Sequence, residues 1–168
     1  MDMPLDKSFD LLERAKKTLP AQTHTFSRGH YSFVDGAYPV FAERGKGSLV
    51  YDVDGNSYID YTAALGPIIL GYSYESVNAA VRTQLDSGSV FSLPHRLEVE
   101  ASELMCRIIP SCDMAKFSKT GSDSVTAAVR ATRAITGRNK VAYWGGGGVW
   151  HDWFTVITSR NDGIPKSL

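Results

Sequence analysis

The stretch that decides the fold is FSKTGSDSVTAAVRATRAITG, residues 117–137. Its apolar positions repeat with the 3.6-residue period of a helix that buries one face. These positions are Val125, Ala128, Val129 and Ile135. Gly137 supplies a stop signal, because glycine readily takes the left-handed conformation that ends a helix. The pattern therefore predicts a helix that begins near Ser124 and ends before Gly137.

Thr120, Gly121 and Ser122 come directly before this predicted helix. The first N–H groups of a helix have no partner inside it and carry a partial positive charge, so they bind a phosphate group placed there. Gly121 lets such a ligand approach closely. The same residue types also make an ordinary helix N-cap. The spacing alone thus predicts either a phosphate cradle or a plain cap.

Two short strand-like segments flank the helix, Met114–Phe117 before it and Lys140–Trp144 after it. Strand, helix and strand of this length predict a right-handed crossover in a parallel sheet. Ligands of such sheets bind where strands end and helices begin. The turn at Thr120 lies at a position of that kind.

The upstream half alternates between helical and strand-like patterns. Ser8–Leu19 reads as an amphipathic helix, whose apolar face needs another surface to cover. The runs Leu49–Val53 and Tyr58–Tyr61 flank Asp54-Gly55-Asn56, which is a strong hairpin signal. The other expected elements are a strand at Val40 and Phe41, a turn at Gly45-Lys46-Gly47, and helices over Tyr74–Leu85 and Arg96–Ile108.

Composition limits the classes of function. The 168 residues, 43% of them hydrophobic, suffice for a core in one domain or in a piece of a larger one. Lys plus Arg equals Asp plus Glu at 18 each, so no net charge favours nucleic acid or anionic lipid, and we expect a small-molecule partner.

Cysteine and histidine usage excludes two further classes of site. Cys106 and Cys112 are too few and wrongly spaced for a disulfide framework or a zinc site, which indicates a reducing compartment. His24, His30 and His95 are scattered without ligand spacing, so we expect no metal site. No segment has the pattern of a signal peptide or a membrane span, and cytoplasm is the expected location.

Several segments, taken in order, form a longer pattern. They are Tyr51-Asp52-Val53-Asp54-Gly55-Asn56, Tyr58-Ile59-Asp60-Tyr61, Gly66-Pro67, Leu70-Gly71 and Thr120-Gly121-Ser122-Asp123. Together they resemble the N-terminal region of class III aminotransferases, which depend on pyridoxal 5'-phosphate, and most of all the glutamate-1-semialdehyde aminomutase branch. The resemblance runs from about Phe26 to the end of the chain.

The resemblance implies an α/β chain that is an incomplete fold type I aminotransferase. Residues 1–37 would form an N-terminal arm and loop, 38–72 the antiparallel hairpin segment of the small domain, and 73–168 the first βαβ part of a truncated large domain that binds the cofactor. Because this family works as dimers, the expected partner is a second copy or a chain that carries the missing C-terminal half.

The resemblance also assigns the cofactor site. Gly121 and Ser122 match the positions that hold the cofactor phosphate, with Thr120 beside them. The family places an aromatic ring on the pyridine and a histidine after it, and here the matching positions are Gly147 and Gly148. Because a stacked ring contributes about 0.5–1.5 kcal/mol beyond area burial, we expect weakened binding of pyridoxal phosphate.

Two positions bear on the substrate. Leu65 stands before Gly66-Pro67, where the aminomutase branch carries a tryptophan, so a related amino-acid or amino-sugar substrate is as plausible as glutamate-1-semialdehyde. Ser27 matches a substrate-pocket serine with loose spacing, and a solvated loop serine is the alternative for it.

The resemblance assigns no catalytic residue to this chain. In the family the lysine that bonds to the cofactor lies further along than Leu168, so we expect the chain alone to be catalytically incomplete. Two functions stay open. One is a part of an aminotransferase or aminomutase, and the other is a non-catalytic remnant, a binding or oligomerisation module that retains the phosphate cradle.

Overall fold

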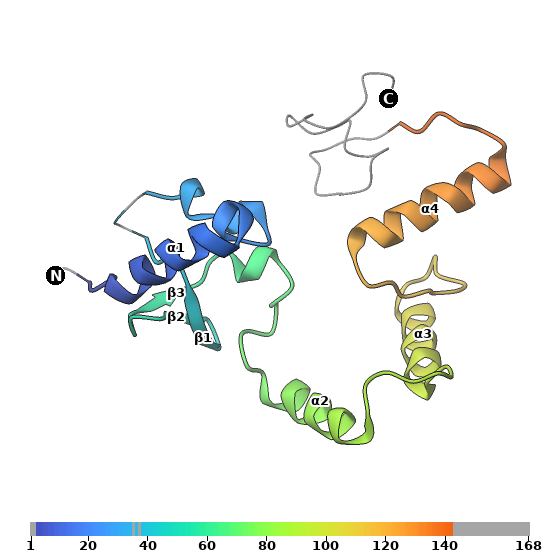
Figure 1. The fold of residues 1–168 in the computed structure, drawn as a ribbon. Coiled ribbons are helices and arrows are strands. Elements are labelled where there is room, and N and C mark those ends of the chain that lie inside the picture. Colours follow the sequence, from blue (N-terminus) through green and yellow to red (C-terminus); the bar gives the residue numbers. More distant parts are fainter. Residues whose placement is uncertain (1–2, 35, 37, 143–168) are drawn as a thin grey trace. The chain divides into compact units, whose positions relative to one another are not determined.

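A computed structural model describes residues 3–34, 36 and 38–142 (Figure 1). The chain divides into two compact units, the first ending at Val90 and the second beginning at Phe91. Each unit is described by itself below. Four 3₁₀ turns accompany the described helices and strands, at Pro20–Gln22, Phe26–Arg28, His30–Ser32 and Ala63–Leu65.

The first unit contains an antiparallel sheet of three strands in the order β1-β2-β3. The strands are β1 (Ala42–Lys46), β2 (Leu49–Asp52) and β3 (Ser57–Ile59). Asp54-Gly55-Asn56 connects β2 to β3, as the hairpin signal predicts, and Gly55 takes a φ of +95° there. The antiparallel hairpin is thus confirmed.

The first strand is predicted at Val40 and Phe41, but the structure places it at Ala42–Lys46, so it excludes both of these residues. It includes Gly45 and Lys46, for which the sequence predicts a turn. The side chain of Tyr72 explains the glycine, since a Cβ at Gly45 would overlap the Tyr72 ring. The Gly47 N–H donates to the Tyr72 carbonyl at 2.9 Å, and the Tyr72 N–H returns a bond at 2.8 Å. Glycine at position 45 therefore lets the Tyr72 ring pack closely against β1, and it does not form a turn.

Helix α1 (Asp6–Thr18) docks on the β2–β3 turn (Figure 1). Its N-cap residue offers no side-chain hydrogen bond. The Asp54 carboxylate replaces it, accepting from the N–H groups of Lys7 at 2.8 Å and Ser8 at 3.0 Å. The Asn56 side-chain amide also donates to the Pro4 carbonyl at 2.8 Å. The start of α1 is thus held by the hairpin, whereas its buried Leu12 lines a small hollow with His30, Tyr38 and Val40.

Three more helices confirm the predictions made from the apolar periodicity of the sequence. They are α2 (Glu75–Ser87) in the first unit, and α3 (Arg96–Ile108) and α4 (Gly121–Thr136) in the second. A capping box between His95 and Glu98 starts α3. Gly137 ends α4 with a φ of +66°, the left-handed C-cap expected from the sequence.

The predicted parallel pair is not formed in the described residues. Met114–Phe117 belongs to no strand, nor do residues 140–142, and the rest of the second predicted strand lies outside the described part. A strand needs a neighbour to receive its backbone hydrogen bonds. Met114 is 90% exposed and Phe117 53% exposed, so no neighbouring strand in the described residues covers these two side chains.

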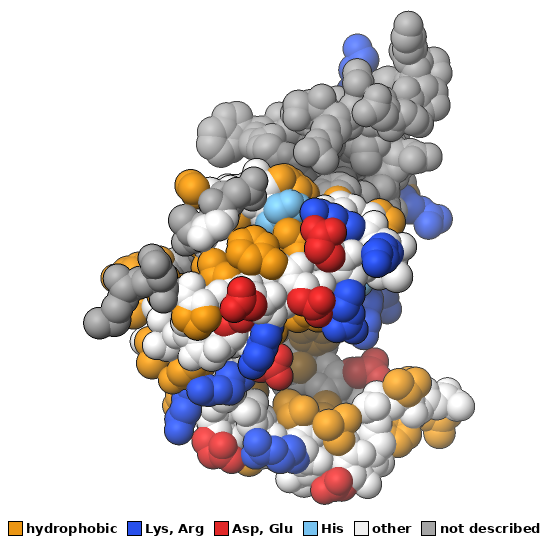
Figure 2. All heavy atoms as spheres, turned by 60° about the vertical axis from the view of Figure 1, so that its left-hand side comes forward, with side chains coloured by type: hydrophobic (Ala, Val, Ile, Leu, Met, Phe, Trp, Pro, Cys, Tyr) orange, Lys and Arg blue, Asp and Glu red, His pale blue; other side chains and the backbone are white. Residues whose placement is uncertain are grey.

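Large apolar side chains lie at the surface beside charged ones (Figure 2). On α2, Val77, Val81 and Leu85 are 49%, 51% and 59% exposed, although they share one face of the helix. On α3, Leu104 and Ile108 are 45% and 60% exposed. These helices therefore carry apolar faces that the described residues do not cover.

Candidate functional site

The start of α4 is organised around Thr120, the N-cap residue. Its hydroxyl oxygen accepts a hydrogen bond from the Asp123 N–H at 3.2 Å, and the Asp123 carboxylate accepts one from the Thr120 N–H at 3.0 Å. The Thr120 hydroxyl also donates to the same carboxylate at 2.8 Å. This reciprocal arrangement is a capping box. The Thr120 side chain is thus engaged in the helix cap, which was one of the two roles open to this turn.

Gly121 is the first residue of α4 and is exposed. A Cβ added there would meet nothing within 4 Å, and its φ is not left-handed, so the described fold does not itself require glycine. The Gly121 N–H donates no hydrogen bond to any of the described residues. An open N–H on a glycine at a helix N-terminus has the chemistry of an anion site.

Ser122 follows in the same turn and is only 8% exposed. Its carbonyl accepts a hydrogen bond from the Thr126 hydroxyl at 2.8 Å, which ties it to the next turn of α4. The structure thus brings Thr120, Gly121 and Ser122 together at one helix end, as the sequence predicts. The remaining cofactor candidates, Gly147 and Gly148, lie outside the described residues, and their part in a site stays a prediction.

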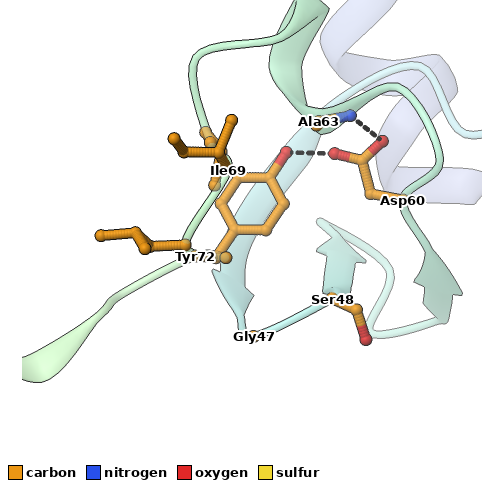
Figure 3. A pocket seen from close by; sticks show the side chains of 9 residues that line it. Gly47, Ser48, Asp60, Ala63, Ile69 and Tyr72 are labelled. Atoms are coloured by element: carbon orange, nitrogen blue, oxygen red, sulfur yellow. Dashed lines mark hydrogen bonds between the residues drawn. The ribbon is translucent and has the colours of Figure 1, made fainter.

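A second candidate site is an open hollow in the first unit, with a volume of about 350 Å³ (Figure 3). Asp60 and Tyr72 point toward one another across it, and the Tyr72 hydroxyl donates to the Asp60 carboxylate at 2.6 Å. The residues that line the hollow are Gly47, Ser48, Asp60, Ala63, Ile68, Ile69, Leu70, Gly71 and Tyr72.

The Asp60 carboxylate is held in its charged form. The hydrogen bond from Tyr72 lowers the pKa of Asp60, and the N–H groups of Thr62 at 2.8 Å and Ala63 at 3.2 Å lower it further against the effect of burial. The same hydrogen bond, followed by burial, raises the pKa of Tyr72. Both Asp60 carboxylate oxygens therefore accept hydrogen bonds from Thr62, Ala63 and Tyr72, and these bonds hold the loop that follows Asp60.

The loop after Asp60 has an unusual backbone. Ala63, Ala64 and Leu65 all have positive φ, at 48°, 53° and 72°, ahead of Gly66 at 107°. The left-handed region costs a non-glycine residue about 1–2 kcal/mol, and such strain gathers where a surrounding structure holds it for function. Leu65, the sequence-predicted substrate position, is 51% exposed at the end of this turn.

Arg28 connects this turn to the other substrate candidate. Its guanidinium donates to the Ala64 carbonyl at 3.1 Å. The exposed Ser27 precedes Arg28, and Leu65 follows Ala64, so the structure brings the two candidate segments together. We had not predicted Asp60 and Tyr72 as site residues. The sequence could have indicated the role of Asp60, because an aspartate side chain often accepts a hydrogen bond from the N–H two residues later and so stabilises a turn, as Asp60 does with Thr62.

Two kinds of feature are absent from the part of the chain that the structure describes. No group of three or more His, Cys, Asp and Glu side chains is arranged to hold a metal ion. No described helix is both long and apolar enough to cross a membrane. The start of α4 and the hollow belong to different units, and each candidate site is considered by itself.

Comparison with known proteins gives consistent matches. The profile of the family described as aminotransferase class-III matches residues 31–161. The chain is 41% identical to a 3-aminobutyryl-CoA aminotransferase from Cloacimonas acidaminovorans, over 99% of this chain and 39% of that protein. It is 40% identical to a glutamate-1-semialdehyde 2,1-aminomutase from Archaeoglobus fulgidus, over 83% of this chain and 32% of the relative.

The structure resembles a solved transaminase with pyridoxal phosphate bound, with a TM-score of 0.78 and 28% identity over 91% of this chain and 35% of that one. This likeness confirms the expected fold class, an incomplete α/β aminotransferase fold. The chain spans between about a third and two fifths of the lengths of these proteins.

Proposed function

Because this chain belongs to the class III aminotransferase family, we propose that it supplies the phosphate side of a pyridoxal 5'-phosphate site in a protein that transfers an amino group or moves it within its substrate. The observation that carries the proposal is the start of α4, where an exposed glycine offers an open N–H beside the buried Ser122. The family profile covers this turn.

The residues at this turn fit a phosphate group. The Gly121 N–H would donate to a phosphate oxygen, and the space beside its Cα would leave room for the group. The N-terminal partial charge of α4 attracts the anion, and the capping box between Thr120 and Asp123 fixes the first turn. The cofactor, when bound, supplies an electron sink for the carbanion formed on the substrate. The described residues contribute binding and orientation.

For the substrate, we propose a small amino acid of the glutamate-1-semialdehyde class, with an amino sugar as the second choice. The Ser27 segment and the Leu65 turn lie on the substrate side in this proposal, supported by the Arg28 hydrogen bond that holds them together. The chain is nearly as similar to an aminotransferase as to an aminomutase, at 41% and 40% identity, so both reaction types are retained.

The test is cofactor binding by the 168-residue chain, measured by equilibrium dialysis with pyridoxal phosphate and with pyridoxal, which lacks the phosphate. We expect pyridoxal phosphate to bind more tightly. Ser122→Ala should weaken it about tenfold or more, since a hydrogen bond to a charged group contributes roughly 1.5–3 kcal/mol. Ser87→Ala removes a hydroxyl from the end of α2 and should have no effect. Equal affinity for both ligands in all three chains would overturn the proposal.

A second candidate function is a binding or oligomerisation module without catalysis. The observations in its favour are the uncovered apolar faces of α2 and α3 and the engagement of the Thr120 side chain in a cap. A chain that associates with itself and binds pyridoxal phosphate more tightly than pyridoxal, but transfers no amino group, would favour this second function over the first.

A further inference from the structure

We propose that Cys106 and Cys112 form a reversible dithiol site that a small-molecule disulfide converts to an intrachain disulfide. The two Sγ atoms lie 3.8 Å apart, and neither sulfur is in a disulfide. A disulfide needs about 2.05 Å between sulfurs, so a movement of about 2 Å brings them to bonding distance. The inference is independent of the proposed cofactor site.

The end of α3 sets up this contact. The Ile109 N–H donates to the Met105 carbonyl at 3.0 Å, and Pro110 then prevents another helical turn. The Cys112 N–H donates to the Ile109 carbonyl at 3.0 Å, which turns the chain back toward the helix. Cys106 lies in the last turn of α3, so the reversal places Cys112 against it.

A second contact shows that the returning segment follows α3. The Ser102 hydroxyl oxygen, one helical turn before Cys106, lies 3.3 Å from the Ala115 carbonyl oxygen and 2.8 Å from the Glu98 carbonyl oxygen within α3. The pairs 102 with 115 and 106 with 112 are nested about the same turn, as in an antiparallel fold-back. The fold-back of the backbone thus holds the two sulfur atoms close together.

Both cysteines are partly exposed, so a small disulfide reaches them. Burial, followed by the hydrogen bond with Cys106, raises the pKa of Cys112, which favours the thiol form of this residue. The sequence spacing excludes a structural disulfide framework, and a single reversible pair is compatible with a reducing compartment.

The reaction is a thiol–disulfide exchange in two steps. One protein thiolate attacks the small disulfide RSSR, which forms a mixed disulfide and releases one RSH after protonation. The second protein thiolate then attacks the protein sulfur of the mixed disulfide and releases the second RSH. In sum, two cysteine thiols are oxidised to one disulfide while one RSSR is reduced to two RSH.

The experiment equilibrates the 168-residue chain with oxidised and reduced glutathione and counts free thiols and glutathione adducts by mass spectrometry. The equilibrium constant for ring closure is measured in native buffer and in concentrated urea. Because the native fold-back holds the sulfurs together, we expect closure to be about tenfold more favourable in native buffer. By thermodynamic linkage the oxidised chain then unfolds at higher urea than the reduced chain.

Three variants test the geometry. Cys106→Ser and Cys112→Ser each leave one thiol and should stop at the mixed disulfide. The double variant Cys112→Ser with Ser111→Cys keeps two thiols in a loop of nearly the same length but moves one off the fold-back, and it should lose the native advantage. A closure constant in native wild-type chain no larger than that in urea, or disulfides formed only between chains, would overturn the inference.

Discussion

Asp52 concentrates more polar contacts than any neighbour in the sheet, although it is only 3% exposed. Its carboxylate accepts from the Asn56 N–H and side chain at 2.8 Å each, from the Asp54 N–H at 3.0 Å and from the Tyr58 hydroxyl at 2.9 Å. Burial favours the neutral acid, but these bonds outweigh it and lower the pKa of Asp52. Burial and the bond to Asp52 raise the pKa of Tyr58 to about 12.

These shifts predict how stability depends on pH. A depressed carboxylate pKa stabilises the fold above the ordinary value of 3.8, and this contribution is lost as pH falls through the lower folded pKa. The raised tyrosine pKa stabilises the fold below pH 10.0, and that contribution is lost as pH rises toward about 12. Urea unfolding at a series of pH values should show both losses in the wild-type chain.

Asp52→Ala should lower the free energy of unfolding by about 2–4 kcal/mol at neutral pH, because it leaves several half-buried donors without their acceptor. It should also flatten the acid limb of the pH profile. Asp10→Ala removes an exposed carboxylate from α1 and serves as the control. Equal stability of the two variants would contradict the structural role of Asp52.

At Gly147 and Gly148, the family resemblance predicts that two substitutions strengthen cofactor binding. Gly147→Tyr with Gly148→His restores the stacking ring and its neighbour, so the affinity for pyridoxal phosphate should rise by about 0.5–1.5 kcal/mol in equilibrium dialysis. The same double substitution combined with Ser122→Ala should bind less tightly than it does with Ser122 intact. If neither change alters cofactor affinity, the turn at Thr120 is a helix cap alone.

The helices and the hairpin could be predicted because each is marked by a pattern in its own residues or in those next to it. The four helices follow from apolar periodicity, from Pro110 after α3 and from Gly137 after α4. The β2–β3 hairpin follows from its Asp-Gly turn. The strand position of Gly45 could not be predicted, because its cause is the ring of Tyr72, which lies far along the sequence.

Gly45 therefore offers a test of packing between elements. Gly45→Ala places a methyl group where the Tyr72 ring lies, so it should displace that ring, break its bond to Asp60 and lower the unfolding midpoint in urea. In a Tyr72→Ala background the same substitution should cost less, because the ring is gone and only the Cβ of residue 72, 2.8 Å from the added methyl group, still obstructs it. Equal costs in the two backgrounds would show that the ring does not set the requirement for glycine.

For the whole molecule, the uncovered apolar faces predict association of the chain with itself. Val81 on α2 is 51% exposed and lies on the face shared with Val77 and Leu85. Sedimentation velocity should show a weight-average mass that rises with concentration, and Val81→Lys should reduce it. Thr83→Lys adds the same charge elsewhere on the helix and should have less effect. A compact monomer at every concentration would contradict the prediction.

The candidate cofactor site at the start of α4 could be predicted only in part from the sequence. The sequence marks the start of α4 and its residue types, but a cap and a phosphate cradle use the same Ser/Thr/Gly chemistry. The structure assigns the Thr120 side chain to the cap and leaves the Gly121 N–H open. The contact between Asp60 and Tyr72 joins residues 12 apart and depends on the strained loop between them, which no local pattern reports.

The cap of α1 by Asp54 has a consequence for synthesis. The carboxylate lies 47 residues after Lys7 and 46 after Ser8, so the ribosome makes the helix well before it makes the group that completes the helix. A helix of 13 residues is marginal on its own in water. The nascent α1 segment is therefore only partly helical, and accessible to chaperones and proteases, until the β2–β3 turn has been translated. Completion of this helix thus depends on a turn that is made later than the helix itself.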